Sequence, residues 1–214
     1  MDNEVINKEK IKQVVDTYNK FAKIYADHTS QKLLQFQLTK FISLLPDKGK
    51  ILDAGCGCGR DSEYLQDEGL PVVAVDLSDG MLEQAKLKNV NAIKMDLINM
   101  NFQDNEFSGI WCMATLADIP KDEAKKVIKY FHKMLKPDGT IYIAVKEGKG
   151  EQIIEKERYG NMPRFYAFYK KEELESLLKE NDFEIIESII SIDEGTKWVE
   201  TFAKNIKVII DVEK

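Results

Sequence analysis

Apolar and polar positions along this 214-residue chain follow two periods, one typical of amphipathic helices and the other of buried strands. Residues 8–26 and 30–45 place apolar side chains three and four positions apart, which predicts two helices before the first strand. From residue 50 onward, short apolar runs alternate with helical patterns. This alternation predicts strands at 50–54, 71–76, 91–95, 107–113 and 139–145, and helices at 60–68, 78–88 and 121–135.

Strands that alternate with helices predict a parallel sheet with helices on both of its faces. The continuous apolar run at 141–145 fits a strand that is buried on both sides. The C-terminal third differs, because residues 146–164 are polar and contain glycine, and the aromatic run at 165–169 is compatible with a short extra strand. Residues 206–214 have no pattern that can be assigned. The remaining predicted elements are a helix at 170–180 and strands at 183–192 and 197–204.

The most informative segment is ILDAGCGCGR, residues 51–60, where a strand runs into a turn with glycine at every second position. A strand, a glycine turn and a helix start form a cradle for a nucleotide cofactor, because glycine lets the backbone approach its ligand closely. Asp76 ends the next predicted strand, 21 positions after Gly55. That spacing is near the one expected for an acid that binds a ribose.

The details of the turn favour one cofactor over another. Its glycines follow G-x-G-x-G rather than the G-x-G-x-x-G of dinucleotide sites, and Asp53 and Asp61 flank it. Two carboxylates would repel a pyrophosphate, and Arg60 offsets that repulsion only in part. A ligand with a cationic amino-acid end and a sulfonium tolerates them better. The pattern therefore favours S-adenosylmethionine and disfavours an NAD-dependent oxidoreductase.

Several motifs in order make the chain similar to the class I S-adenosylmethionine-dependent methyltransferases. Residues 52–59, 75–82 and 94–97 resemble the first three motifs of that family, and 107–120 and 135–140 resemble its later segments. The resemblance implies an α/β fold with a doubly wound, Rossmann-like seven-stranded sheet. That sheet is mostly parallel with an antiparallel last strand, has helices on both faces, and carries an N-terminal helical lid.

The resemblance also implies a single methyltransferase domain over 1–214. Within it we expect a lid at 1–46, a cofactor-binding core at 50–145, and a substrate loop and C-terminal hairpin at 146–204. The expected cofactor is S-adenosylmethionine, released as S-adenosylhomocysteine. The cofactor-binding residues expected from the motifs are Tyr25, Asp53, Gly55, Cys56, Gly57, Gly59, Arg60, Asp76, Leu77, Met81, Met95, Asp96, Leu97 and Met113.

Three further residues are candidates for catalysis or acceptor binding. Tyr18 and Tyr25 lie seven apart in a segment that resembles the Y-D-x-x-A-x-x-Y signature of small-molecule methyltransferases, although Asn19 replaces its acid. Their rings could meet a cation, or could be ordinary core aromatics. Asp118 could accept a proton or hold an amine, or could belong to a helix start before Pro120. Arg164 would suit a carboxylate or phosphate of the acceptor, and Lys146 and His28 are the next candidates.

Composition narrows the classes of partner and compartment. The net charge is −6 and the pI is about 5.2, and lysines alternate with acids, so no nucleic-acid partner is expected. No stretch approaches the roughly 18 apolar residues of a membrane span. The acidic, polar N-terminus does not resemble a signal peptide. Three cysteines in this arrangement suggest neither a disulfide framework nor a metal site, and fit a reducing cytoplasm.

The sequence therefore predicts a cytoplasmic enzyme, monomeric or homodimeric, that methylates an unidentified small molecule. Two alternatives stay open. The first is a protein or RNA methyltransferase, which would require a basic or extended binding surface. The second is a regulatory domain that binds S-adenosylmethionine without catalysis.

Overall fold

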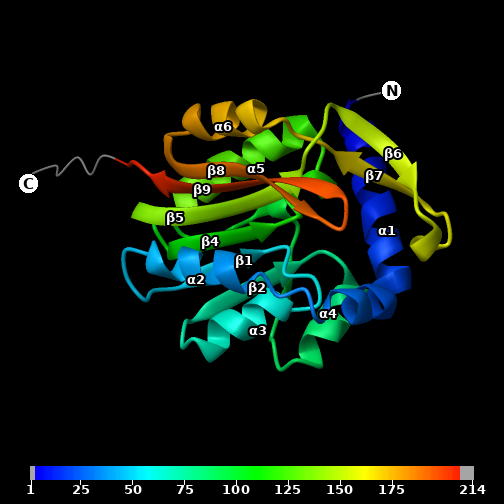
Figure 1. Cartoon of the computed structure of the whole chain (residues 1–214), viewed down its shortest axis with the longest axis horizontal. Coiled ribbons are helices and arrows are strands. Elements are labelled where there is room, and N and C mark those ends of the chain that lie inside the picture. The colour runs from blue at the N-terminus through cyan, green and yellow to red at the C-terminus, as the bar shows by residue number, and fades with distance from the viewer. Residues whose placement is uncertain (1–2, 208–214) are drawn as a thin grey trace, which may run out of the picture.

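A seven-stranded sheet forms the centre of the protein (Figure 1), which is seen here in a computed structural model that describes residues 3–207. The strand order is β3-β2-β1-β4-β5-β9-β8, with β9 antiparallel to both β5 and β8 and the other neighbouring pairs parallel. The predicted sheet, mostly parallel with an antiparallel last strand, is confirmed. The strands are β1 (Ile51–Ala54), β2 (Val72–Asp76), β3 (Ile93–Lys94), β4 (Phe107–Met113), β5 (Leu135–Lys146), β8 (Phe183–Asp193) and β9 (Thr196–Asn205).

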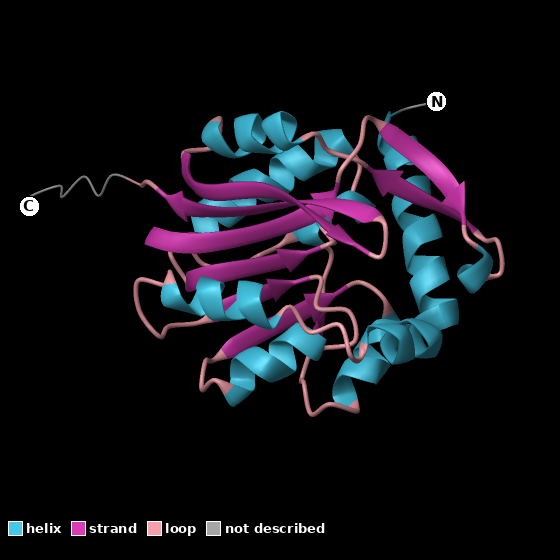
Figure 2. Cartoon of the chain, in the orientation of Figure 1, coloured by secondary structure: helices cyan, strands magenta, loops and turns pink. Residues whose placement is uncertain are grey.

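Helices cover both faces of the sheet because its central strands are apolar on both sides (Figure 2). Buried Ile51 and Trp111 point toward α2 (Gln35–Ser43) and α3 (Arg60–Asp67), which contribute Phe41 and Leu65 to the same cluster. The opposite face packs against α5 (Lys121–Met134) and α6 (Lys171–Lys179). Of the two helices within the expected lid segment 1–46, α2 is packed into this core through Leu38 and Phe41. The remaining helix of the sheet region is α4 (Asp79–Lys86).

The first helix, α1 (Asn3–Thr29), is longer than the predicted 8–26 and is broken at Phe21, where φ is −114° and ψ is 18°. A hairpin of β6 (Glu151–Glu155) and β7 (Pro163–Ala167) packs against it. Figure 1 shows α1 and this hairpin on one side of the molecule, at the ends of the sheet strands. Together, α1 and the β6–β7 hairpin cover the ends of the sheet strands on that side.

Within the polar, glycine-containing segment 146–164, where the sequence predicted no strand, residues 151–155 form β6. Buried and exposed side chains do not alternate along β6, since four of its five residues are exposed. Its strand conformation depends on pairing with β7. The aromatic run is a strand only up to Ala167. The strand expected at 91–95 shortens to two residues, whereas β5 starts four residues before the expected position 139.

No helix among residues 3–207 is long and apolar enough to cross a membrane. Of the unassigned segment 206–214, residues 206 and 207 follow β9 without regular structure, and 208–214 lie outside the described residues.

Candidate active site

The glycine turn after β1 adopts a backbone that favours glycine at all three positions. Gly55, Gly57 and Gly59 have φ values of 82°, 53° and 77°. A Cβ atom on Gly55 would lie 2.2 Å from the side chain of Thr115, so the loops after β1 and β4 touch only because this residue is glycine. Gly59 is the N-cap of α3 and faces Val90, so its role in the structure is packing.

Asp76, at the end of β2, is held in a fixed orientation by the backbone. Its Oδ2 accepts a hydrogen bond from the Gly57 amide at 2.9 Å, and its Oδ1 accepts one from the Ser78 amide at 2.8 Å. Burial raises the pKa of this carboxyl, while the two amides oppose the increase. The predicted ribose-binding acid is therefore linked directly to the glycine turn.

A cavity of about 90 Å³ opens at the carboxyl ends of β1 to β4, and we call it the cofactor cavity. Helix α1 lines it with the apolar side chains of Ile11, Val14 and Val15, which the sequence indicated only as a helix face. Most of the predicted cofactor residues line this cavity together. They are Tyr25, Gly55, Gly57, Asp76, Leu77, Met81, Met95, Asp96, Leu97 and Met113, joined by Tyr18 and Asp118.

A hollow of about 40 Å³ beside it is lined by three more of the predicted residues, Asp53, Cys56 and Arg60, whereas Gly59 lines neither space. Arg60 forms two hydrogen bonds to Asp61, from Nε to Oδ1 at 2.6 Å and from Nη2 to Oδ2 at 2.9 Å. Ser62 Oγ donates to Asp53 Oδ2 at 2.6 Å. The cofactor cavity and this hollow share the walls formed by Tyr25, Gly55, Gly57 and Met113.

Asp53 gives a prediction about pH and stability. Burial and the nearby charge of Asp61 raise its pKa to about 7. Because an unfolded aspartate titrates near pH 4, the folded protein binds more protons between about pH 4 and 7, and its free energy of unfolding falls as the pH rises. We expect Asp53→Asn to flatten this dependence and to raise stability at pH 8 by about 1 kcal/mol or more.

Urea unfolding at pH 5 and pH 8 would measure this effect. The matched control is Asp67→Asn, which changes an exposed carboxylate at the end of α3. Parallel pH curves for Asp53→Asn and the unchanged protein would contradict the prediction.

A second cavity of about 360 Å³ adjoins the first, and we call it the acceptor cavity. Its wall includes Lys146 at the end of β5 and Arg164 on β7. Both cavities are lined by Tyr18, Tyr25, Met113, Ala114 and Asp118, so they meet at these residues. The wall also includes residues that the sequence did not indicate, among them Tyr142, Lys156, Tyr159, Trp198 and Glu200, and it includes Tyr166 from the aromatic run at 165–169.

The three predicted catalytic or acceptor residues come together at this junction. Tyr18 donates from its hydroxyl to Asp118 Oδ2 at 3.1 Å, and Arg164 Nη2 donates to Asp118 Oδ1 and to the Tyr18 oxygen, each at 2.5 Å. The guanidinium of Arg164 also lies 4.1 Å from the centre of the Tyr18 ring and 4.6 Å from that of Tyr166. Asp118 is therefore one member of a buried ion pair.

Asn19, to which the sequence gave no clear role, connects α1 to the loop after β2 and the start of α4. Its Oδ1 accepts hydrogen bonds from Ser78 Oγ at 2.8 Å and from the Gly80 amide at 3.0 Å. Gly80 permits this contact, because a Cβ atom there would lie 2.8 Å from the Asn19 carbonyl oxygen. Helix α1 is thus attached to the same loop that orients Asp76.

The sheet is parallel except for β9, a glycine turn follows β1, and an oriented acid ends β2. These features define an α/β protein that binds a nucleotide-type cofactor at the carboxyl ends of its strands.

Comparison with known proteins makes the assignment narrower. A family model described as a methyltransferase domain matches residues 51–139. The chain is 31% identical over 136 residues to YqeM of Bacillus subtilis (strain 168), covering 60% of this chain and 55% of that protein. It is 33% identical over 97 residues to a demethylmenaquinone methyltransferase of Renibacterium salmoninarum, covering 44% and 40%. The chain thus spans about half the length of these relatives.

Among solved structures, the fold resembles a 1,6-didemethyltoxoflavin-N1-methyltransferase of Burkholderia thailandensis. The TM-score is 0.70 at 21% identity, with 90% of this chain and 85% of that chain covered. A Methanosarcina mazei protein described as an S-adenosylmethionine-dependent methyltransferase gives a TM-score of 0.69 at 20% identity, with 77% and 95% covered. Residues 51–139 therefore match the methyltransferase domain that the motifs predicted, and the fold of the chain resembles that of S-adenosylmethionine-dependent methyltransferases.

Proposed function

We propose that this protein transfers the methyl group of S-adenosylmethionine to a small molecule held in the acceptor cavity. The observation that carries the proposal is the junction of the two cavities at Tyr18, Met113 and Asp118. A donor in the first cavity and an acceptor in the second would meet there. Holding both reactants in line is the main contribution that a protein makes to such a transfer.

The residues of the cofactor cavity suit this cofactor. Asp76 presents a carboxylate that is already oriented by Gly57 and Ser78, which suits the paired hydroxyls of a ribose. Asp53 and Arg60 in the adjoining hollow provide one group of each charge for an amino-acid end. A Cβ atom on Gly57 would meet only Tyr25, at 4.0 Å, so the turn leaves room beside its backbone. When bound, the cofactor supplies a methyl group already activated on a sulfonium.

The closed cofactor cavity is smaller than the roughly 300–1,000 Å³ typical of ligand sites, so we propose that α1 moves outward to admit the cofactor. Its attachment through Asn19 to Ser78 and Gly80 would break and re-form in that movement. We expect amide hydrogen exchange in residues 8–28 to slow at least several-fold when S-adenosylhomocysteine binds, because the bound product stabilises the closed lid. Equal exchange with and without S-adenosylhomocysteine would contradict a moving lid. The amides of α5, whose exchange should not change on binding, are the internal reference.

Two observations favour a small acceptor over a protein or RNA. The acceptor cavity lies under α1 and between β7 and the end of the β8–β9 hairpin, and its volume suits a compact molecule. Several similar proteins have names that refer to small molecules. They are a demethylmenaquinone methyltransferase, a ubiquinone biosynthesis O-methyltransferase and a 1,6-didemethyltoxoflavin-N1-methyltransferase. A cavity of this kind excludes water from the junction and holds the acceptor in one orientation.

The test is to incubate the purified protein with methyl-labelled cofactor and three fractions of a cell extract: small molecules, RNA and protein. The proposal expects label in the small-molecule fraction, and mass analysis then identifies the product. Label found only in RNA or protein would overturn the small acceptor. If every fraction stays unlabelled while the cofactor still binds, a regulatory domain without catalysis becomes the better explanation.

A further inference from the structure

Lys146, the last residue of β5, lies beside the junction of the two cavities. Met113, which lines both cavities, is the register partner of Ala144 on β5. Lys146 follows Ala144 by two positions, a step of about 7 Å along the strand, so both side chains lie on the same face and line the acceptor cavity. The Lys146 Nζ lies 4.2 Å from the centre of the Tyr166 ring and 5.9 Å from that of the Trp198 ring. Strand β5 thus places an amine, between aromatic rings, next to the point where donor and acceptor would meet.

Lys156, the residue after β6, forms a hydrogen bond with Lys146. An ammonium group has three donors and no acceptor, so two lysine amines can share a hydrogen bond only if one of them is neutral. Burial and the charges of Lys156 and Arg164 lower the pKa of Lys146 to about 7. Lys146 is therefore the neutral partner above that pH, and Lys156 is the donor. Any anion that also contacts Lys156 would favour the same assignment, because it would stabilise the ammonium form of Lys156.

Other ionisable side chains face this part of the cavity from α1, β7, β9 and the loop after β4. Tyr18 on α1 stays protonated, because burial raises its pKa well above the ordinary value. Glu200 on β9 accepts hydrogen bonds from Tyr142 at 2.8 Å and from Gln37 at 3.0 Å. Asp118, after β4, favours the protonated form of Lys146 but is paired with Arg164 of β7. Protonation of Asp118 would leave that buried guanidinium without its counter-charge, so the ion pair opposes the use of Asp118 as a base.

We propose that Lys146 is the general base of the transfer and takes the proton from a weakly acidic O–H or N–H group of a small aromatic acceptor. The assignment rests on the proposed function. The acceptor atom bonds to the methyl carbon as the bond from that carbon to sulfur breaks, and the acceptor proton moves to the Lys146 Nζ. The positive charge thus passes from the sulfonium to the ammonium of Lys146. The rings of Tyr166 and Trp198 suit a planar acceptor, and a base of this kind suits one that still carries its proton near neutral pH.

A base at this position gives turnover a defined dependence on pH. Only the neutral amine accepts a proton, and the pKa of Lys146 is about 7 in the free protein. We therefore expect kcat/KM to rise by up to tenfold for each pH unit below 7 and to become constant above it. In Lys146→Met and Lys146→Arg, turnover should fall at least 100-fold and the rise near pH 7 should disappear. Arginine keeps the positive charge but stays protonated, so a loss in both variants distinguishes a base from a residue that only binds an anion.

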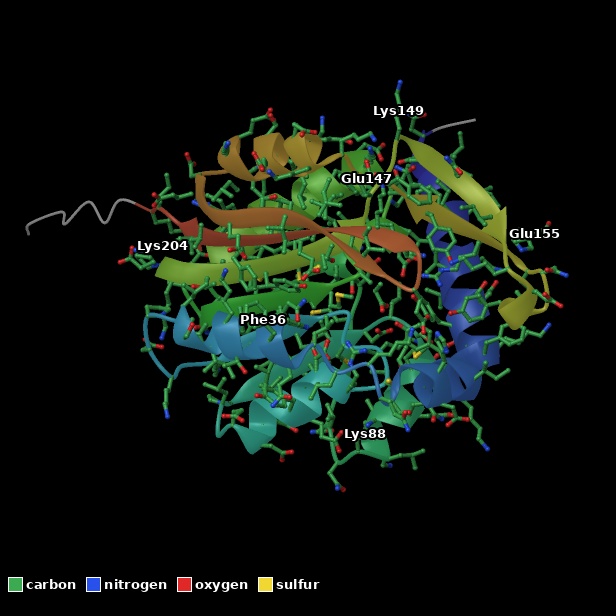
Figure 3. The ribbon with its side chains drawn as sticks, in the orientation of Figure 1. Phe36, Lys88, Glu147, Lys149, Glu155 and Lys204 are labelled. Atoms are coloured by element: carbon green, nitrogen blue, oxygen red, sulfur yellow. The ribbon has the colours of Figure 1, made fainter. Side chains whose placement is uncertain are left out.

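The first measurement is the rate at which label passes from methyl-labelled S-adenosylmethionine into the small-molecule fraction of a cell extract, followed between about pH 5.5 and 9. Ethylamine added to Lys146→Ala should raise this rate at least fivefold, because a free amine can replace the missing base. It should leave the rate of Lys146→Arg unchanged. The matched control is Lys149→Met, which removes a lysine three positions away whose side chain points away from the protein (Figure 3). This control should keep both the rate and the pH profile of the unchanged protein.

The second measurement needs no turnover. Acetic anhydride reacts with neutral amines only, so the pH dependence of acetylation at each lysine, located by mass spectrometry, reports where that lysine loses its proton. In the full-length protein saturated with S-adenosylhomocysteine, we expect Lys146 to reach half of its maximal rate near pH 7, whereas an ordinary surface lysine does so near pH 10.

The two measurements separate failure of the base from failure of the proposed function. Acetylation of Lys146 that rises only toward pH 10 would overturn the base, and so would full turnover in Lys146→Arg or a failure of ethylamine to restore Lys146→Ala. In each of these cases label still enters the small-molecule fraction, and the proposed function stands. If no label enters that fraction although Lys146 is acetylated near pH 7, the proposed function has failed and the role of Lys146 as its base fails with it.

Discussion

Replacement of Asp118 by alanine is expected to lower the free energy of unfolding by about 3–5 kcal/mol. The change leaves the guanidinium of Arg164, a residue only 5% exposed, without its carboxylate partner in a buried site. The hydroxyl of Tyr18 loses its acceptor in the same step. Urea unfolding at pH 7 measures the effect, with Asp67→Ala as the exposed control.

A double variant separates the destabilising effect of an unpaired buried charge from other effects of the substitution on stability. When Arg164→Met accompanies Asp118→Leu, no unpaired charge is left, and most of the lost stability should return. If the double variant is as unstable as the sum of its single changes, the ion pair is not the cause. A loss below about 1 kcal/mol in Asp118→Ala would also contradict the argument, since exposed pairs behave in that way.

Replacement of Asp76 by alanine is expected to weaken the binding of S-adenosylhomocysteine by about 1–3 kcal/mol, which is roughly 5- to 150-fold. The variant loses the carboxylate that would accept from the ribose, and it releases the amides of Gly57 and Ser78 from their orientation. Calorimetry with the product measures the change. Asp79→Ala is the control, because Asp79 lies nearby but its carboxylate contacts Lys94 at the surface.

Two results would contradict the assignment of Asp76 and of the cofactor. Unchanged affinity in Asp76→Ala would remove this residue from the cofactor site. Binding of NAD by the unchanged protein, with S-adenosylhomocysteine ignored, would overturn the choice of cofactor itself.

The cofactor half of this protein could be predicted because its signals are local in the sequence. The turn at 55–59 follows its strand directly, and Asp76 ends the next strand. In a parallel sheet the carboxyl ends of such strands meet at one edge. Residues separated by more than twenty positions could therefore be placed together without knowledge of any long-range contact, and the sheet order followed from the same resemblance.

The acceptor half could be predicted only in part, because its contacts join distant segments. Tyr18 and Asp118 are 100 positions apart, and Tyr18 and Arg164 are 146 apart. The sequence indicated each residue singly, but neither their ion pair nor its burial. Lys156 had no signal, because β6 is a strand through its pairing with β7 rather than through its own pattern. The aromatic run that contains Tyr166 indicated a short strand, but not the strand with which it pairs.

The β6–β7 hairpin has a consequence for engineering this protein. It lies between β5 and α6, outside the main sheet, and supplies Arg164 and Tyr166 to the acceptor cavity. Exchange of residues 147–169 for another hairpin is therefore expected to change the wall of the acceptor cavity while the loops of the cofactor cavity stay intact. The graft has one fixed requirement, an arginine at position 164, because without it Asp118 and Tyr18 would lose the partner that joins the hairpin to the rest of the site.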